Sequence, residues 1–323
     1  MKRALLLLAF ALPLHAQLLT PTVRGVVVAH EGRIRLGELN LDGVANATAV
    51  AASNDQVVVL DALHDEAVIA DLATGRIARI ETAETPIAAA FDGGELYILC
   101  RDARVLQHGN ARIALSADPA FLKTANGKVY VYARAAGIVE EIENDRVTRR
   151  FSTAPFASDF EISGGTAYLA YPRDARIRTI DLQEMKTSGE IAVGAVPVDL
   201  AFAGGGTALT ARILAVADPS AKRVWLTEGT QSTAKAVARG FLRGFLGLGL
   251  FGSRASQFPT GVDRVEVHGK QWLAYDSSSG TLYRFDRKTS SVIARNVAPG
   301  AFTLTRNGVA WWNGTSVAEL TLE

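Results

Sequence analysis

The sequence predicts an all-β protein built as a seven-bladed β-propeller, and three observations support this prediction. Six of the ten prolines open the same local pattern, at Pro86, Pro119, Pro155, Pro197, Pro259 and Pro299. Their spacings are 33, 36, 42, 62 and 40 residues, and four of these lie near the ~40-residue length of a four-stranded blade. The apolar runs between them are short, end at Gly, Asp, Asn or Ser, and show no helical period.

Each unit reads as four strands. The unit that begins at Pro155 predicts strands at 159–162, 167–171, 176–181 and 190–193. A seventh unit starts near Asn46, 40 residues before Pro86, without the proline. If the segment around Asn46 is not a full blade, the ring has six blades instead.

The last unit, from Pro299, has room for three strands only. We expect its missing strand to come from the start of the chain, at 23–29 or 34–39. Closure by N- and C-terminal strands would remove the open edge that an incomplete ring exposes.

The N-terminus predicts export. Lys2 and Arg3 precede an apolar run over 4–14 and the small residue Ala16, which is the pattern of a signal peptide covering 1–16. The run is shorter than the about 20 residues that span a bilayer, and a buried helix is the other interpretation. Residues 17–323 then form one propeller domain in the periplasm or outside the cell.

The single cysteine, Cys100, ends an apolar run. We expect it to be a buried strand residue rather than a nucleophile. Because no cysteine directly follows the signal segment, the chain is not expected to be a lipoprotein, and it has no internal disulfide. Stability in an oxidising compartment must then come from core burial.

The charge is balanced. Without Lys2 and Arg3, 32 basic residues face 33 acidic ones. Such a balance provides no electrostatic footprint for nucleic acid.

The units resemble the YVTN-type β-propeller repeats of secreted bacterial proteins, in which a Tyr/Val strand precedes a hydrophobic strand that ends in Asp and a Thr-Gly turn. The closest copies lie at 57–60 with 67–76, at 167–170 with 177–181, and at 272–276 with 281–286. The resemblance covers most of 40–320. It implies the fold and not an activity, because binding proteins, lactonase-like enzymes and lyases share it.

The loops on one face of the predicted ring place several charges at a similar height. They are Arg101, Asp102, Arg134, Arg173, Asp174, Asp218 and Asp276. Such a ring would hold an anionic or sugar-like ligand by charge-assisted hydrogen bonds. The alternative is that Asp and Arg simply make good solvated turns.

The innermost strands offer a second set of candidates for the central channel: Lys123, Asp159, Asp199 and Asp263. Their carboxylates suit a hard cation such as calcium, and the resemblance implies a metal in lactonase-type members. The alternative is a water-filled channel with balanced charge.

An insertion over about 235–258 interrupts the fifth unit, after Trp225 and before Pro259. It is rich in Gly, Phe and Leu, and its contact candidates are Phe241, Arg243, Phe245 and Phe251. Apolar residues mixed with Lys and Arg indicate a segment that lies on a membrane or binds a partner. A flap folded over one face of the propeller and a substrate lid are the other interpretations.

The chain contains no nucleophile elbow, phosphate loop, dinucleotide fingerprint or paired metal-binding histidines. The leading prediction is therefore a secreted or periplasmic scaffold that binds a small-molecule ligand or a protein, without a cofactor. The alternative is a metal-dependent, lactonase-like hydrolase or lyase with Asp159, Asp199 and Asp263 as candidate ligands of a divalent cation.

Overall fold

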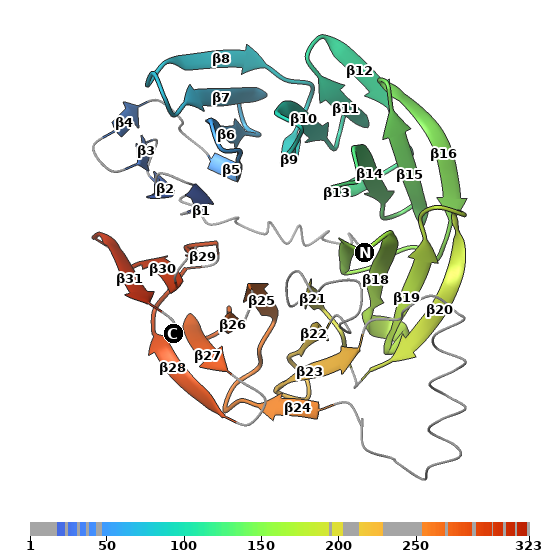
Figure 1. Ribbon diagram of the computed structural model, residues 1–323, viewed down its shortest axis with the longest axis vertical. Coiled ribbons are helices and arrows are strands. Elements are labelled where there is room, and N and C mark those ends of the chain that lie inside the picture. Colours follow the sequence, from blue (N-terminus) through green and yellow to red (C-terminus); the bar gives the residue numbers. More distant parts are fainter. Residues whose placement is uncertain are drawn as a thin grey trace, which may run out of the picture.

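The computed structural model describes residues 18–22, 25–30, 33–36, 39–42, 47–193, 196–202, 213–228, 254–268, 271–285, 289–298, 300–305, 308–313 and 315–321. Within these ranges the chain forms seven four-stranded sheets, one three-stranded sheet and a single 3-10 turn at Pro172–Asp174. The sheets follow one another around a central axis (Figure 1). The all-β propeller predicted from the sequence is confirmed.

The first four sheets are built from consecutive strands. They are β1 Leu18–Thr22, β2 Gly25–His30, β3 Arg33–Leu36 and β4 Leu39–Asp42; β5 Ala47–Ala52, β6 Gln56–Asp61, β7 Glu66–Asp71 and β8 Ile77–Glu81; β9 Pro86–Asp92, β10 Glu95–Cys100, β11 Val105–His108 and β12 Ala111–Ala114; β13 Pro119–Ala125, β14 Lys128–Ala133, β15 Ile138–Glu143 and β16 Arg146–Ser152.

The other four sheets follow the same rule. They are β17 Asp159–Ser163, β18 Thr166–Tyr171, β19 Arg176–Asp181 and β20 Lys186–Ala192; β21 Asp199–Phe202, β22 Ile213–Asp218, β23 Arg223–Glu228 and β24 Arg254–Gln257; β25 Arg264–His268, β26 Gln271–Asp276, β27 Thr281–Phe285 and β28 Ser290–Ala294; β29 Phe302–Leu304, β30 Gly308–Trp312 and β31 Val317–Thr321.

All seven predicted units form blades, from the one near Asn46 to the one at Pro299. The closure differs from the prediction in one respect. Among the described residues, no N-terminal strand joins the last blade, β29–β31; instead, the N-terminal strands pair with one another in a further four-stranded sheet, β1–β4. Because β1 packs beside both β5 and β29, the two ends of the chain still close the ring, by packing rather than by a shared sheet.

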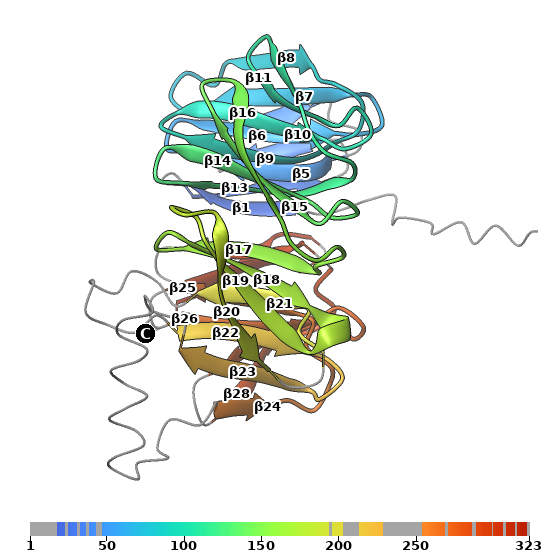
Figure 2. The same ribbon diagram turned by 90° about the vertical axis from the view of Figure 1, so that its right-hand side faces the viewer.

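The first strand of each sheet lies next to the axis and the last lies on the outside, and the strands run along the short axis of the ring (Figure 2). Alternate side chains of each strand point to opposite faces of its sheet. On β6, Val58 and Leu60 pack with Ile98 and Cys100 of the next blade, whereas Val57 belongs to a separate cluster. The hydrophobic core therefore lies in the seams between neighbouring blades.

Cys100 is fully buried in one of these seams, as predicted. Burial raises the pKa of its thiol to about 11. Because the thiolate is the reactive form, Cys100 is a core residue and a poor nucleophile at neutral pH.

Outer strands are where the predicted boundaries differ most. The strand predicted at 190–193 begins at Lys186, and its pairing with β19 shifts register between Thr179 and Ile180. A solvated outer strand carries polar residues, so it lacks the apolar signal that marks inner strands. The last residues of the predicted insertion likewise form β24, which pairs with β23.

Two adjacent glutamates on β15 are buried in opposite seams. Glu140 accepts hydrogen bonds from the backbone N and hydroxyl of Ser116, at 3.0 and 3.1 Å, and from Arg150 Nε at 2.8 Å. Glu141 points the other way and accepts from Lys128 Nζ at 3.1 Å and from both sides of the Arg149 guanidinium.

Arg149 carries this second contact into the next blade. Its Nη2 donates to the carbonyl of Leu182 at 2.8 Å and its Nη1 to that of Gln183 at 2.7 Å. Although burial raises the pKa of Glu141, hydrogen bonds from Arg149 and Lys128 outweigh it and lower the pKa to about 2. The blade β13–β16 is thus fastened by buried charge on both sides.

Candidate functional site

Six charged side chains from four neighbouring inner strands lie close together beside the axis. They are Lys123 on β13, Asp159 and Glu161 on β17, Asp199 on β21, and Arg264 and Glu266 on β25. We call this set the inner belt. Because residues two apart on a strand share one face of the sheet, Asp159 and Glu161 point into the same seam, as do Arg264 and Glu266.

The first members of the inner belt join three blades. Lys123 Nζ lies 2.5 Å from Glu161 Oε1 on the next inner strand. Asp159 is buried and accepts the backbone N–H of Phe160 at 2.8 Å and that of Leu200, on the following strand, also at 2.8 Å. Each side chain thus bridges its own blade to the next one.

The same arrangement continues around the ring. Asp199 accepts the backbone N–H of Val265 at 2.7 Å, and Glu266 accepts that of Leu304 on β29. Backbone donors therefore fix the carboxylates before any ligand arrives, which is the condition for a preorganised polar site.

Burial dominates the titration of the aspartates. It raises the pKa of Asp159 to about 6, with a further increase from the charge of Glu161 and a decrease from Lys123. Burial and the neighbouring charge of Asp159 hold the pKa of Asp199 well above its usual range. Burial opposes the charge of Lys123, but Glu161 and Asp159 outweigh it and raise its pKa. The inner belt therefore holds two aspartates whose charged forms are disfavoured, beside a lysine whose charged form is favoured.

The cation on β25 has two partners. Arg264 forms an ion pair with Glu266, and its guanidinium carbon lies 4.5 Å from the centre of the Phe302 ring. Burial raises the pKa of Glu266 despite this arginine. The side chain of Arg264 is 39% exposed and that of Glu266 18% exposed, so this end of the inner belt is accessible to a ligand.

The inner belt occupies only part of the ring. On β5 and β9 the positions that match Asp159 and Glu161 in register are alanines: Ala49 and Ala51, and Ala88 and Ala90. One side of the axis therefore carries charges and another carries methyl groups. Such a division favours a ligand bound off-centre, against one set of seams.

The face of the ring that carries the turns after the second strands is called the loop face. Two of its aspartates, Asp218 and Asp276, stabilise their own turns. Asp218 accepts hydrogen bonds from the Ser220 hydroxyl at 2.8 Å and the Ala221 backbone at 3.1 Å. Asp276 accepts from the backbone of Ser278 at 2.9 Å and is buried. Although burial raises the pKa of both groups, these hydrogen bonds outweigh it and lower the pKa. Both carboxylates are therefore occupied within the turns that they close.

Other predicted loop residues also have internal partners. Asp102 accepts from the Thr85 hydroxyl at 2.6 Å and lies 3.3 Å from Arg101, and the Thr85 bond is the main reason that its pKa is lowered. Arg134 Nε lies 3.1 Å from Asp118. These pairs leave each arginine about half exposed.

The turn Pro172–Asp174 is the exception among these loops. Asp174 lies 3.5 Å from Arg178, but Arg173 has no carboxylate partner within the part of the chain that the structure describes. Its guanidinium carbon lies 5.9 Å from the centre of the exposed Phe156 ring.

The structure brings three of the four predicted channel residues together, Lys123, Asp159 and Asp199. It places Asp263 at the loop face, where the Ser277 backbone donates to it at 3.1 Å. Arg264 takes the register position that the prediction gave to Asp263, because Arg264, like Asp159, pairs with the next-to-last residue of the second strand.

Sequence reasoning missed Glu161, Arg264 and Glu266. The alternation of charged residues along the strand was a usable signal, since Asp159 and Glu161, like Arg264 and Glu266, are two residues apart. The predicted contact residues Phe241, Arg243, Phe245 and Phe251 lie outside the described residues, as does the predicted signal peptide at 1–16.

Within the described ranges, no three or more His, Cys, Asp or Glu side chains are grouped so as to hold a metal ion. Within the same ranges, no helix has the length and apolar character needed to cross a membrane.

Comparisons with solved structures support the fold. The chain is similar to BamB from Moraxella catarrhalis, with a TM-score of 0.65 and 11% identity over 94% of this chain and 98% of that one. It is also similar to virginiamycin B lyase from Staphylococcus aureus, with a TM-score of 0.63 and 10% identity over 86% and 95% of the two chains. No family model and no curated protein matches the chain. At these identities the likeness shows a β-propeller and nothing about activity.

The pair Asp159 and Asp199 predicts an unusual dependence of stability on pH. A carboxyl group whose pKa is raised by folding binds its proton more tightly in the folded state, so its contribution to stability is present at low pH and is lost as the pH rises. With the folded-state pKa of Asp159 at about 6, we expect this loss between about pH 4 and pH 7.

The variant Asp199→Asn tests this expectation. An amide oxygen still accepts the Val265 N–H, but one of the two charges is gone. We expect the free energy of unfolding near pH 8 to rise by about 1–2 kcal/mol and its slope between pH 4 and pH 7 to flatten. Urea unfolding at several pH values measures both. Asp263→Asn, outside the pair, is the control and should leave the slope unchanged; an equal effect there would contradict the assignment.

Proposed function

We propose that the protein is an exported propeller that acts as a binding scaffold, with the inner belt as its ligand-binding site. The preorganisation of the inner belt is the observation that supports this most. Backbone donors of neighbouring strands hold the carboxylates of Asp159, Asp199 and Glu266 in place, and partly exposed Lys123, Glu161 and Arg264 stand beside them. A fixed set of charged donors and acceptors binds polar ligands by charge-assisted hydrogen bonds.

The composition of the inner belt indicates the class of ligand. Cations and carboxylates alternate along neighbouring seams, so a ligand needs both donors and acceptors, as sugars and amino acids have. The methyl-lined strands β5 and β9 would accommodate its less polar side.

The alternative is a metal-dependent, lactonase-like hydrolase or lyase. It draws on Asp159, Asp199 and Asp263 as ligands, and a divalent cation such as calcium as the metal. Asp263 lies at the loop face with Ser277 rather than with the other two, so no observation favours this reading over the scaffold.

Export is the second part of the proposal. The apolar N-terminal run with Lys2, Arg3 and Ala16 supports a secreted or periplasmic protein of the YVTN-repeat type. The insertion over about 235–258 is proposed as a further contact surface for a partner protein or a membrane.

A thermal-shift panel tests the proposed site. We expect at least one class among sugars, amino acids, polyamines and dicarboxylates to raise the Tm of the wild-type protein, and the shift to fall by half or more in Glu161→Gln. Glu184→Gln is the matched control, because Glu184 pairs with Lys186 on an exposed turn.

Native mass spectrometry in the presence of calcium separates the two functions. The scaffold is expected to give the mass of the bare chain. One tightly held ion per chain, together with hydrolysis of a lactone that a chelator abolishes, would overturn the proposal in favour of the hydrolase.

A further inference from the structure

Phe156 has a large aromatic side chain that is exposed to solvent on the loop face. It is 54% exposed and lies just before β17, on the same face as the turn Pro172–Asp174. Its backbone φ is +64°, a left-handed conformation that bulky residues rarely adopt. An exposed ring gains little from folding, so neither burial nor backbone preference explains a phenylalanine here. Such an outlier points to function when the surroundings enforce it.

The neighbouring blade holds Phe156 in this backbone conformation from one side. The backbone N–H of Phe156 donates to the carbonyl of Arg134 at 2.9 Å. Gly137 lets the two segments approach, since a Cβ there would lie 2.7 Å from the Thr153 carbonyl oxygen and 2.8 Å from Pro155 N. Only glycine permits this contact, so the approach of 153–155 to the turn after β14 is built into the sequence.

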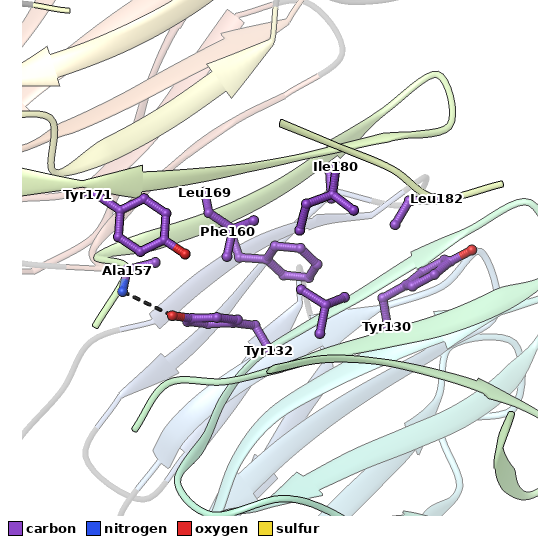
Figure 3. Close-up of a cluster of buried hydrophobic side chains, with 10 residues drawn as sticks. Tyr130, Tyr132, Ala157, Phe160, Leu169, Tyr171, Ile180 and Leu182 are labelled. Atoms are coloured by element: carbon purple, nitrogen blue, oxygen red, sulfur yellow. Dashed lines mark hydrogen bonds between the residues drawn. The ribbon is translucent and has the colours of Figure 1, made fainter. Parts of the chain in front are cut away.

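Two buried tyrosines hold the residues on either side of Phe156 in place. The hydroxyls of Tyr132 and Tyr171 both donate to the carbonyl of Ala154, each at 2.8 Å. Tyr132 also accepts the N–H of Ala157 at 3.2 Å, as Figure 3 shows. The residues on either side of Phe156 are therefore anchored in the seam between β13–β16 and β17–β20, and the ring is presented on a rigid base.

The charge beside the ring is positive. Arg173 lies over Phe156 and lacks a carboxylate partner among the described residues, and Arg134, 47% exposed, is only partly neutralised by Asp118. An exposed aromatic ring with an arginine over it has the composition of a protein-binding hot spot, and Arg134 belongs to the segment whose backbone Phe156 contacts. Because the available charge is cationic, the complementary partner is acidic.

We propose that Phe156, Arg173 and Arg134, which we call the aromatic–basic patch, dock a peptide segment in which a large apolar side chain lies close to a carboxylate. This inference rests on the proposed binding function and names a second class of partner for it. The apolar side chain stacks on Phe156 and the carboxylate pairs with Arg173. The rigid base lowers the ordering cost of binding.

Selection from a random linear-peptide library on the immobilised protein tests the inference. We expect enriched peptides to combine an aromatic or large aliphatic residue with Asp or Glu. Phe156→Asn should weaken their binding about tenfold or more. Since asparagine tolerates the left-handed backbone, this variant should have a Tm no lower than that of the wild type, which separates lost contact from lost fold.

Two matched controls sharpen the result. Leu63 is 71% exposed and stands, like Arg173, two residues past the end of a second strand, so Leu63→Asn should leave peptide binding unchanged. Arg173→Gln should weaken binding and reduce its salt dependence, whereas Arg176→Gln, which removes an arginine paired with Glu190, should not.

Several results would overturn the inference: no enrichment, enriched peptides without acidic residues, or equal losses in Phe156→Asn and Leu63→Asn. None of these would affect the inner belt, whose proposed function is decided by the compound panel and by Glu161→Gln.

Discussion

Replacing Gly137 by alanine is expected to lower the free energy of unfolding by about 3 kcal/mol. Two effects add. Gly137 has a φ of +64°, which costs an alanine about 1 kcal/mol or more. Its Cβ would also lie within 2.9 Å of three backbone atoms of Thr153, Ala154 and Pro155, so the neighbouring segment must move. The urea midpoint measures the loss.

Gly127 provides the control in the same blade. It has a φ of +72°, but a Cβ there would meet nothing within 4 Å. Gly127→Ala therefore carries the backbone cost alone, about 1 kcal/mol. If the two variants lose the same stability, the close approach beneath Phe156 contributes nothing, and the rigid base described above is wrong.

Glu141→Gln is expected to cost about 3 kcal/mol at neutral pH. Glu141 is 1% exposed and accepts hydrogen bonds from Lys128, Arg149 and Thr148. A neutral amide leaves Arg149 with a weaker partner, and Arg149 holds the Leu182 and Gln183 carbonyls of the next blade. The loss should therefore appear as a weaker seam between β13–β16 and β17–β20.

The dependence on pH identifies the charge as the cause. The pKa of Glu141 is lowered to about 2 in the folded protein, so its contribution is present above its unfolded pKa of about 4.3 and is lost as the pH falls towards 2. The difference between wild type and Glu141→Gln should shrink over this range. Glu143→Gln, on the same strand but 44% exposed, should change stability by less than about 0.5 kcal/mol. A difference that persists at pH 2 would assign the effect to shape instead of charge.

The proline pattern was sufficient to predict the blades but not their register. The equivalent inner-strand residues Asp159, Asp199 and Arg264 lie four, two and five residues after their prolines. The prolines mark where the chain enters a blade, whereas hydrogen bonding to the second strand decides which residue faces which seam. Counting four residues from Pro259, as from Pro155 to Asp159, therefore predicted Asp263 at the position that Arg264 occupies.

Buried charge was the other feature beyond sequence reasoning. The run around Glu140 and Glu141 is rich in acidic and basic residues and looks like a solvated face, yet both glutamates are buried. Their partners Ser116 and Arg149 come from separate segments, so no local sequence pattern indicates that these residues bind the glutamates. The N-terminal sheet was missed for a related reason, since Pro21 lies inside β1 instead of opening the repeated pattern of the other blades.

The way the ring closes has a consequence for how the chain is made. Every sheet in the described residues consists of strands that are consecutive in sequence, and the first and last sheets meet by packing alone. Within the described residues, no blade includes a strand from the far end of the chain. A polypeptide that emerges N-terminus first can complete its hydrogen bonds one blade at a time, and only the final seam between β1 and β29 requires the whole chain. This topology therefore permits vectorial assembly, with the contact of longest sequence separation formed last.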